Sequence, residues 1–540
     1  MNNQSLGQIL KGFGIVDDDV LAYALKIAKT SGSRLGETLQ ALGFVTDLEI
    51  AQAIAHQSRA EFTDLNEAYA PDVLRLVPFN FAQKHMVLPL ALDGGYLTLA
   101  TEDPGNPTLP GLLGRFVSHP LRLVVAPKGL LIKEIQRRYF RAEHPLDEEI
   151  ERMSQSIAAG RDFAAERLVE LLIASAIDGH ASDMHISPTP LASLVSLRVD
   201  GVLLLRYSLP ATAHQRLVSA VKVLSALDIA DQNRAQDGRM AFNYLEGRYD
   251  LRISTMPGVN GENLVIRVLA GNHDMYSLAS IGFSETQIAQ IDRLTQRSHG
   301  AILVTGPTGS GKTTTLYAML RRINMLQRNV LTVEDPVEIR VPMARQMEVN
   351  EKAGVTFATA IRAFLRQDPD VILVGEIRDT DTAQLTLRAS QTGHLVLSTV
   401  HTNDAVGAIV RLRDLACQDF VLSASLNGVV AQRLVRRLCP HCRQASAPSA
   451  AARQRHGELP EQVFEHVGCE RCNRTGYLGR SAIAEIIEFD GELRSMIERG
   501  AMPTEIETRA RQLGVKSLLD AGRALVAAGL TDLAELERVI

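Results

Sequence analysis

The chain has 540 residues, of which 46% are hydrophobic and 22% are charged, and its formal net charge is −5. This length predicts three to five domains, and the composition is that of an ordinary globular protein. The weakly acidic balance gives no reason to expect nucleic acid as a direct partner. Because there is no run of 18 apolar residues and no basic start before an apolar core, we expect neither a membrane-spanning helix nor a secretory signal. Any membrane contact should be peripheral or through a partner.

The first 60 residues contain an internal repeat with an offset of 29 residues. Each copy reads L-G-x-x-L-x-x-x-G, followed by a polar turn and a second amphipathic stretch. The matching positions include Leu6 and Leu35, Gly7 and Gly36, Leu10 and Leu39, and Gly14 and Gly43. This pattern predicts two helix–turn–helix units packed on each other, and a helical bundle used only for docking is the simpler interpretation.

The next stretches are read from strand and turn signals. Residues 88–100 are typical of a hairpin that turns at Asp93-Gly94-Gly95, and 121–126 of a further strand. Paired strands are expected at 194–199 and 201–207, and again at 249–255 and 263–269, after a helix at 167–176. The predicted organisation is an N-terminal docking domain, a linker, a mixed α/β domain, a catalytic core, a cysteine element and a helical end, at 1–140, 141–163, 164–275, 276–437, 438–480 and 481–540.

The most specific motif follows the apolar run 301–304. It reads G-P-T-G-S-G-K-T and passes into a helical pattern, which is a phosphate-binding loop between a strand and a helix. Glycines let phosphate oxygens approach backbone N–H groups, and the helix dipole favours negative charge there. Lys312 is expected to bridge the β- and γ-phosphates and Thr313 to bind Mg²⁺. The alternative is a glycine-rich turn before an ordinary helix.

Ionisable residues stand at the ends of the expected core strands. Glu376 follows the strand 371–374 in the form of a Walker B element, with Glu where Asp is more usual, and Glu334 follows the strand 330–333. His394 and His401 bracket the strand 395–399 and are candidate γ-phosphate contacts. Alternating strands and helices predict a parallel sheet covered on both faces, whose strand ends gather ligands. Taken singly, each residue is as well explained by a solvated charge or a packed histidine.

Four of the five cysteines form two C-x-x-C pairs separated by 26 residues. The cysteines are Cys439, Cys442, Cys469 and Cys472. This arrangement predicts a structural tetrathiolate zinc site with a looped-out arm, in the reducing conditions of a cytoplasm. Redox disulfides are the alternative.

The core motifs together resemble one family. Residues 365–370 followed by VILVGEIRD, TVEDPVE at 332–338 and GHLVLSTVHTNDA at 393–405 are similar to motifs of the ATPases of type II secretion and type IV pilus assembly. Upstream, 181–186, 198–201 and 236–239 match the preceding domain of that family. The resemblance implies a RecA-like P-loop ATPase core after a mixed α/β, PAS-like domain, a helical and α/β N-terminal domain, and a zinc-knuckle insertion. It also implies a homohexamer that binds an inner-membrane platform protein or the cytoplasmic domain of a membrane assembly protein and drives pseudopilus or pilus assembly.

The resemblance also implies roles for single residues. Glu376 would act on Mg²⁺, Glu334 would position the attacking water, and His394 and His401 would sense the γ-phosphate. Arg252 and Arg267 match arginines thought to close over the phosphates, although without the resemblance ordinary strand-face pairing is the favoured explanation. The residues expected to bind ATP are Gly306, Pro307, Thr308, Gly309, Ser310, Gly311, Lys312, Thr313 and Thr314.

The second N-terminal repeat is similar to a cyclic-di-GMP-binding repeat found in some of these ATPases. The residues that carry this similarity are Arg34, Leu35, Gly36, Gly43 and Gln57. Glycines would let guanine approach the backbone, and Arg34 would bond its edge. The first copy departs from the pattern, with Ser5 in place of Arg and Ala28 in place of Gln. The similarity of the second repeat makes a cyclic-di-GMP sensor that gates the motor one alternative function. An ATPase of DNA uptake or conjugation is another.

Overall fold

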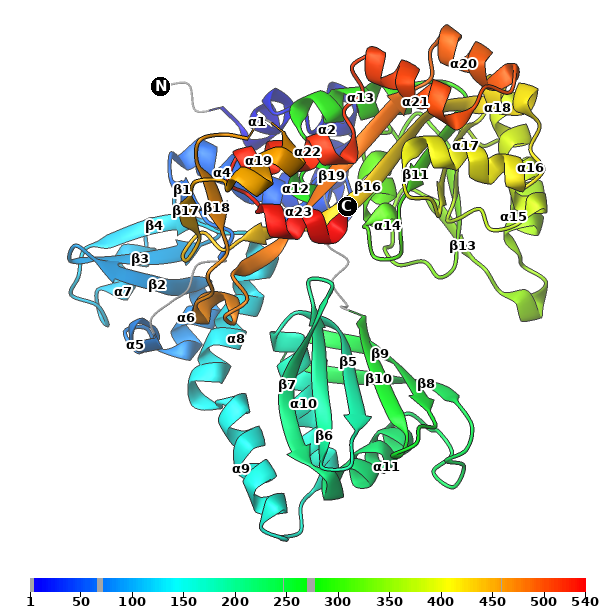
Figure 1. Cartoon of the computed structure of the whole chain (residues 1–540). Coiled ribbons are helices and arrows are strands. Elements are labelled where there is room, and N and C mark those ends of the chain that lie inside the picture. Colours follow the sequence, from blue (N-terminus) through cyan, green and yellow to red (C-terminus); the bar gives the residue numbers. More distant parts are fainter. Residues whose placement is uncertain (1–3, 66–70, 246, 270–276, 458) are drawn as a thin grey trace. The chain divides into compact units, whose positions relative to one another are not determined.

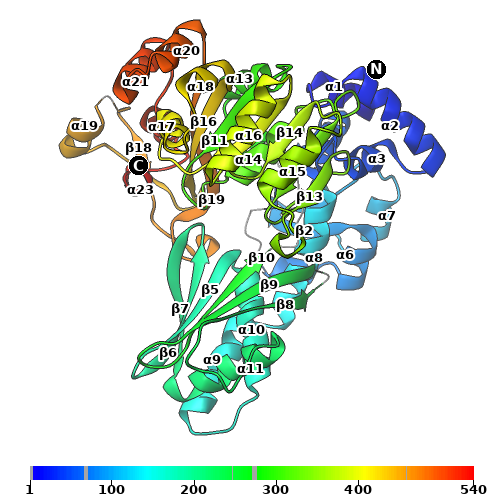
Figure 2. The ribbon, with the colours of Figure 1, turned by 90° about the vertical axis from the view of Figure 1, so that its right-hand side faces the viewer.

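The computed structural model describes residues 4–65, 71–245, 247–269, 277–457 and 459–540. The chain divides into two compact units, one made of 1–10 and 47–273 and the other of 11–46 and 274–540. Figures 1 and 2 show the elements of each unit. These units do not follow the predicted boundary at 140/141, and the predicted boundary at 275/276 lies outside the described residues.

Each copy of the N-terminal repeat forms a pair of helices, as predicted, and the packing of the two pairs on each other stays a prediction. The pairs are α1 (Leu6–Gly12) with α2 (Asp18–Ser31), and α3 (Leu35–Ala41) with α4 (Asp47–Ser58). Gly14 and Gly43 occupy equivalent positions after the shorter helices, with φ of 69° and 78°. A left-handed backbone there suits glycine, which explains why the repeat keeps it at both positions.

A small α/β layer follows in the first unit. Its sheet has the order β1-β4-β3-β2, and the predicted hairpin 88–100 is confirmed as β2 and β3, which turn at Gly94 and Gly95 with positive φ. The elements are β1 (Glu61–Phe62), α5 (Pro71–Leu74), α6 (Phe79–His85), β2 (Val87–Asp93), β3 (Tyr96–Thr101), α7 (Leu109–Leu113), β4 (Leu121–Val125) and α8 (Lys128–Glu143).

The segment interpreted as a linker, 141–163, is largely helical. It contains α9 (Leu146–Ala158), whose Leu146, Ile150 and Ile157 are buried in the same core as α10 (Ala165–Asp178). The charged residues that suggested a linker lie on the outer face of an amphipathic helix. The segment is therefore a packed part of its unit.

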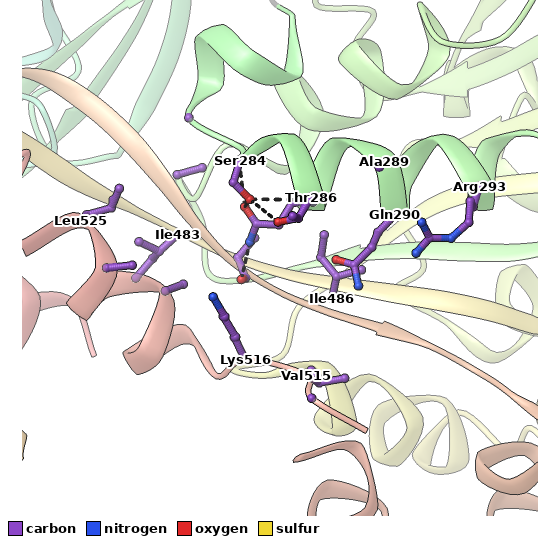
Figure 3. Close-up of a pocket in the computed structure, with 17 residues that line it drawn as sticks. Ser284, Thr286, Ala289, Gln290, Arg293, Ile483, Ile486, Val515, Lys516 and Leu525 are labelled. Carbon is purple, nitrogen blue, oxygen red and sulfur yellow. Dashed lines mark hydrogen bonds between the residues drawn. The ribbon is translucent and has the colours of Figure 1, made fainter. Parts of the chain in front are cut away.

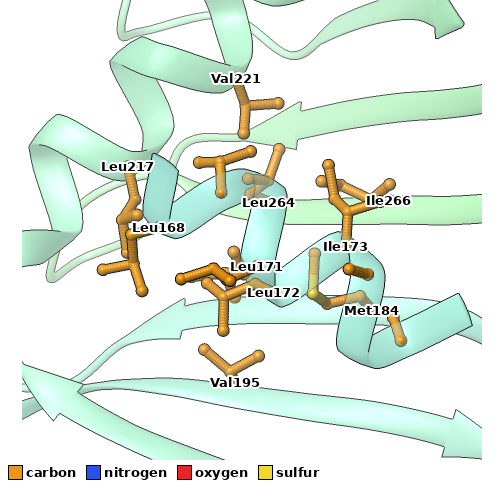
Figure 4. Packing of buried hydrophobic residues seen from close by; sticks show 14 of the residues in the cluster. Leu168, Leu171, Leu172, Ile173, Met184, Val195, Leu217, Val221, Leu264 and Ile266 are labelled. Carbon is orange, nitrogen blue, oxygen red and sulfur yellow. The ribbon is translucent and has the colours of Figure 1, made fainter. Parts of the chain in front are cut away.

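A six-stranded antiparallel sheet forms the rest of the first unit, in the order β7-β6-β5-β10-β9-β8. Its core lies between the sheet and the helices α10 and α11, where Leu172, Leu217 and Ile266 interdigitate (Figure 4). The predicted strand pairs are confirmed, and β5 and β8 add to them. The elements are β5 (Ala181–Pro188), β6 (Ala192–Val199), β7 (Val202–Pro210), α11 (His214–Leu224), β8 (Gln236–Tyr244), β9 (Gly247–Met256) and β10 (Asn263–Leu269).

The second unit is built on a seven-stranded sheet of order β13-β12-β14-β15-β11-β16-β19, parallel except for β19. Separate apolar clusters cover its faces, so the prediction of a parallel sheet between two helical layers is confirmed. Its elements up to β16 are α12 (Leu278–Ile281), α13 (Glu285–Thr295), β11 (Gly300–Thr305), α14 (Lys312–Leu320), β12 (Val330–Glu334), β13 (Arg345–Glu348), α15 (Phe357–Phe364), β14 (Val371–Val374), α16 (Thr380–Gln391), β15 (Leu395–Val400), α17 (Ala405–Asp414), α18 (Asp419–Ser425) and β16 (Leu426–Leu438).

The core sheet does not end before the cysteines. Its last strand, β19 (Tyr477–Glu488), follows the cysteine element and pairs antiparallel with β16. The region 481–540, predicted to be mostly helical, contains four helices but begins within β19, because this non-local pairing leaves no local signal. The remaining elements are β17 (Gln444–Ser446), α19 (Ala450–His456), β18 (Val463–Glu465), α20 (Gly491–Glu498), α21 (Pro503–Gln512), α22 (Leu518–Ala527) and α23 (Leu533–Val539). Within the described ranges, no helix combines the length and apolarity needed to cross a bilayer.

Candidate nucleotide site and cysteine cluster

The phosphate loop joins β11 to α14 and is shaped by three glycines. Gly306, Gly309 and Gly311 have φ of 151°, 78° and 84°. A Cβ on Gly306 would lie 2.4 Å from the carbonyl oxygen of Gln432, so the loop cannot take a larger residue there without moving. The glycines thus allow both the backbone conformation and the close packing that turn N–H groups outward.

Lys312 is the first residue of α14 and folds back over this loop. Its Nζ donates to the carbonyl oxygens of Gly306 at 2.9 Å and Pro307 at 3.1 Å. Burial lowers the pKa of Lys312, and the negative charge of Glu376 opposes that shift. Ser310 Oγ is buried and has no hydrogen-bond partner among the described residues. Because a buried hydroxyl normally has a partner, this one is available to donate to a phosphate oxygen. The loop therefore fits a nucleoside triphosphate.

The two predicted carboxylates lie at the carboxyl edge of the same sheet. Glu376 follows β14, and its carboxylate is 2.6 Å from Arg378 Nη2 and 3.6 Å from His401 Nε2. His401 directly follows β15, the neighbour of β14. Burial and the nearby Lys312 lower the pKa of His401, while Glu376 acts in the opposite direction. The structure thus brings Lys312, Glu376 and His401 into one electrostatic cluster.

Glu334 ends β12 and is 3% exposed. Thr332 Oγ1 donates to it at 2.6 Å and Gln346 Nε2 at 3.2 Å, and the hydroxyl of Tyr317 donates to its other oxygen. Burial, and then the bond to Glu334, raise the pKa of Tyr317 above its ordinary range. Since Tyr317 belongs to α14, the carboxylate is tied to the helix that carries Lys312. A carboxylate held this firmly is suited to orienting a water molecule.

His394 lies at the wrong edge of the sheet for its predicted role. It precedes β15, and its carbonyl oxygen accepts from Gly300 N at the start of β11. The phosphate loop begins after Thr305, so it is separated from His394 by the length of β11, roughly 17 Å. His394 Nδ1 instead lies 2.9 Å from the carbonyl oxygen of Ala389 near the end of α16. The prediction that it senses the γ-phosphate held by this chain's own loop is therefore wrong.

Arg252 and Arg267 belong to the other compact unit. They face each other across β9 and β10, and Arg239 of β8 pairs with Arg252 on its other side. All three line a hollow of about 400 Å³, where Arg267 Nε lies 3.0 Å from Asp183 Oδ1. The structure thus assembles a row of arginines, and sequence reasoning missed its third member, for which Q-D-G-R was the available signal. Their role at the phosphates stays a prediction.

Two further residues of the core escaped prediction. Gln432, buried in β16, donates from Nε2 to the carbonyl oxygen of Ser310 at 2.8 Å. Tyr317 holds Glu334, as described above. Gln432 lies 122 residues from Ser310 within an apolar strand, so only the sheet order reveals its contact with the loop.

The four predicted cysteines converge at the base of the arm between β16 and β19. Their sulfur atoms all lie within 4.8 Å of one another, and the Sγ atoms of Cys469 and Cys472 are 3.8 Å apart. Tetrahedral coordination with zinc–sulfur bonds of about 2.3 Å places sulfurs about 3.8 Å apart, so the set fits zinc. Burial raises the pKa of Cys439 to about 12. It acts likewise on Cys472, but N–H groups of Cys469 and Gly476 outweigh it and lower that pKa.

The residues predicted for cyclic-di-GMP lie at helix ends. Arg34 precedes α3, Leu35 and Gly36 form its first turn, and Gly43 follows it in a left-handed conformation. Gln57, in α4, donates from Nε2 to the carbonyl oxygen of Gln4 at 2.9 Å. Arg34 and Gln57 fall in different compact units, so each is described only in its own surroundings, and binding stays a prediction.

A groove of about 630 Å³ lies between α13, β19 and α22 (Figure 3). Small apolar residues such as Ala482 and Ala484 line it, with Lys516 and Arg293 as its charged residues. The described residues that line it include no carboxylate and none from the phosphate loop. It is thus a surface separate from the nucleotide site.

Comparison with known proteins decides the family. Residues 159–538 match the model described as "Type II/IV secretion system protein", and residues 58–145 match the MshEN domain. The chain belongs to the type II/IV secretion ATPase family. The MshEN match begins after the positions predicted to bind cyclic-di-GMP, which span 34–57.

The relatives of this secretion ATPase include both pilus assembly ATPases and type II secretion proteins. It is 35% identical to the type IV pilus assembly ATPase PilB of Myxococcus xanthus, over 98% of each chain. It is 40% identical to the type II secretion system protein E of Dickeya dadantii, over 87% of this chain and 98% of that one. A PilB of Thermus thermophilus is 38% identical over 94% of this chain, which spans 59% of that relative's length.

Among solved structures, the ATPase DotB of Yersinia pseudotuberculosis superposes with a TM-score of 0.50 at 18% identity, covering 70% of this chain and 94% of that one. That likeness concerns the fold alone. The family and its named relatives establish this chain as an ATPase of secretion or pilus assembly.

Proposed function

We propose that this ATPase works as a homohexameric motor that hydrolyses ATP with Mg²⁺ to drive assembly of a secretion pseudopilus or a type IV pilus. The observation that carries the proposal is the convergence of Lys312, Glu376 and Glu334 at one edge of the core sheet. The names of the relatives, a pilus assembly ATPase and a type II secretion protein, support the proposal that ATP hydrolysis drives filament assembly.

In the proposed reaction, water attacks the γ-phosphorus, the bond to the β-phosphate oxygen breaks, and ADP and phosphate leave. Glu334 orients the water, while Lys312 and the N–H groups of the loop bind the phosphates. Thr313, which is exposed in the first turn of α14, and Glu376 would hold Mg²⁺, which neutralises charge on the phosphates. Arg252 and Arg267 would stabilise the negative charge of the transition state.

We also propose that the ATPase acts in the cytoplasm and reaches the inner membrane through a partner. The partner would be a platform protein or the cytoplasmic domain of a membrane assembly protein. The cysteine cluster would hold one structural zinc ion, since four thiolates close its coordination sphere.

The test is phosphate release by the purified full-length chain with ATP and Mg²⁺, together with its mass in solution. We expect turnover by the wild type, loss of nucleotide binding in Lys312→Ala, and loss of turnover with retained ATP binding in Glu334→Gln. Replacing Glu348, an exposed residue next to Glu334 in the register of β12 and β13, by Gln is the matched control and should leave turnover intact. Turnover by Glu334→Gln at the wild-type rate would refute the role of Glu334, and absence of turnover in an assembled wild type would refute the motor.

A second function is favoured by the N-terminal region. The MshEN match at 58–145 and the helical repeat before it support cyclic-di-GMP binding that gates the motor. Calorimetry on the full-length chain should detect binding that Arg34→Ala weakens, whereas Lys29→Ala, an exposed basic control on α2, leaves it unchanged. No heat of binding at saturating ligand would rule out this second function.

A further inference from the structure

The underside of the phosphate loop rests on one buried side chain of β16. β16 lies beside β11 in the sheet (Figure 2), and Thr305, the last residue of β11, pairs with Ala431 of β16. Gln432 is the next residue of β16, and its side chain contacts the phosphate loop. Its carboxamide makes two hydrogen bonds to residues 310–315. Nε2 donates to the carbonyl oxygen of Ser310 at 2.8 Å, and Oε1 accepts from Thr315 Oγ1 at 2.6 Å.

The bond to Ser310 fixes the direction of a peptide group. In a trans peptide the C=O and the following N–H point in opposite directions. Because Gln432 holds the Ser310 carbonyl toward the sheet, the N–H of Gly311 points away from it, on the side where a phosphate binds. Gly311 precedes the first turn of α14, where helix N–H groups lack partners within the helix.

The bond from Thr315 fixes which end of the amide faces the loop. A carboxamide can flip, which would place oxygen against the Ser310 carbonyl and repel it. The backbone N–H of Thr315 donates to the carbonyl oxygen of Gly311, which fixes Thr315 in α14. From this position its hydroxyl donates to Oε1 of Gln432. A hydroxyl donor at Oε1 keeps Nε2 toward Ser310. Gln432 is fully buried, so no water replaces either bond.

We propose that Gln432 is a positioning residue for nucleotide binding, which sets the orientation of the phosphate-loop amides through Ser310 and is itself oriented by Thr315. The proposal rests on the proposed ATPase function. Gln432 touches no reacting atom, and its effect on the loop is the same with bound ATP as in the transition state. Its loss should therefore raise KM and leave kcat nearly unchanged.

The experiment compares two replacements of Gln432 in the full-length chain. Gln432→Met removes both hydrogen bonds at similar length, and Gln432→Glu keeps the acceptor for Thr315 but loses the donor to Ser310. We expect both to raise KM for ATP and the Kd of a non-hydrolysable analogue by about tenfold or more, with kcat within about threefold. Asn427→Leu is the matched control, because Asn427 is a buried amide of the same strand that binds His299 at the opposite edge. It should lower the melting temperature and leave KM unchanged.

Substitutions of Thr315 keep the test valid if the Gln432 variants fold poorly. Thr315→Val keeps the shape of the side chain but loses the hydroxyl, and should raise KM for ATP. Thr315→Ser keeps the hydroxyl and should have the wild-type KM. Thr386→Val, in the buried face of α16, is the control for loss of a buried hydroxyl. Wild-type KM in Gln432→Glu and in Thr315→Val would overturn the proposal while leaving the ATPase function intact. A wild type that binds no ATP would overturn both.

Discussion

His401 Nε2 lies 3.6 Å from Glu376 Oε2, so the imidazole that follows β15 faces the carboxylate that follows β14. Burial and the positive charge of Lys312 lower the pKa of His401, and Glu376 limits that shift. Since its pKa lies below the ordinary value, His401 is mostly neutral near pH 7.

The first prediction concerns this pair. Glu376→Gln removes the charge that favours imidazolium, so the pKa of His401 should fall further below its ordinary value. Titration of labelled histidines by NMR measures this shift. A rise in the pKa of His401 would contradict the attraction assigned to Glu376.

The second prediction concerns the cysteines. The reduced wild type should contain one zinc ion per chain, and Cys439→Ser or Cys472→Ser should lose it and lower the melting temperature by roughly 5 °C or more. Cys417→Ser, a buried cysteine outside the cluster, should keep the metal. Elemental analysis that finds well under one zinc per chain in the wild type would end this interpretation.

The third prediction concerns the core of the first unit. Leu172 is fully buried between α10 and the sheet (Figure 4), so Leu172→Ala should reduce the free energy of unfolding by about 2–5 kcal/mol. Leu205→Ala, on the edge strand β7, removes the same atoms from a side chain that is 62% exposed and should cost below about 1 kcal/mol. Equal losses in denaturant titrations would show that the packing is not as described.

The fourth prediction concerns pH. His214 is buried, with Nε2 2.8 Å from the carbonyl oxygen of Glu262 and Nδ1 2.8 Å from Ser193 Oγ, and burial lowers its pKa. Below about pH 6.5 the unfolded chain takes up a proton that folded His214 resists, so stability should fall as pH drops through that value. His214→Gln should flatten this dependence in thermal unfolding between pH 5 and 7. A dependence in His214→Gln as steep as that of the wild type would contradict the assignment.

The nucleotide site could largely be predicted because its signals are local. A glycine loop between a strand and a helix, and acids directly after strands, must meet at one edge of a parallel sheet. The same reasoning failed for His394, since residues before and after a strand lie at opposite edges. Only the direction of β15 separates His394 from His401.

The remaining features depend on pairings between distant residues. Gln432 meets Ser310 only because β16 lies beside β11, and β19 joins the sheet only after the cysteine arm has returned. The sequence of α9 suggested a linker because most of its residues are charged or polar. Its buried face consists of only three described residues, Leu146, Ile150 and Ile157. Such features follow from tertiary packing, which overrides local composition.

The strand β16 carries Gln432 beneath the phosphate loop and passes directly into Cys439 of the metal cluster. The path between the two residues is about 23 Å of extended strand, and the pairing of β16 with β19 is irregular between Arg436 and Leu438. One strand therefore carries both the support of the phosphate loop and the approach to the first cysteine of the cluster, so a displacement of the cysteine arm would act on the strand that holds Gln432.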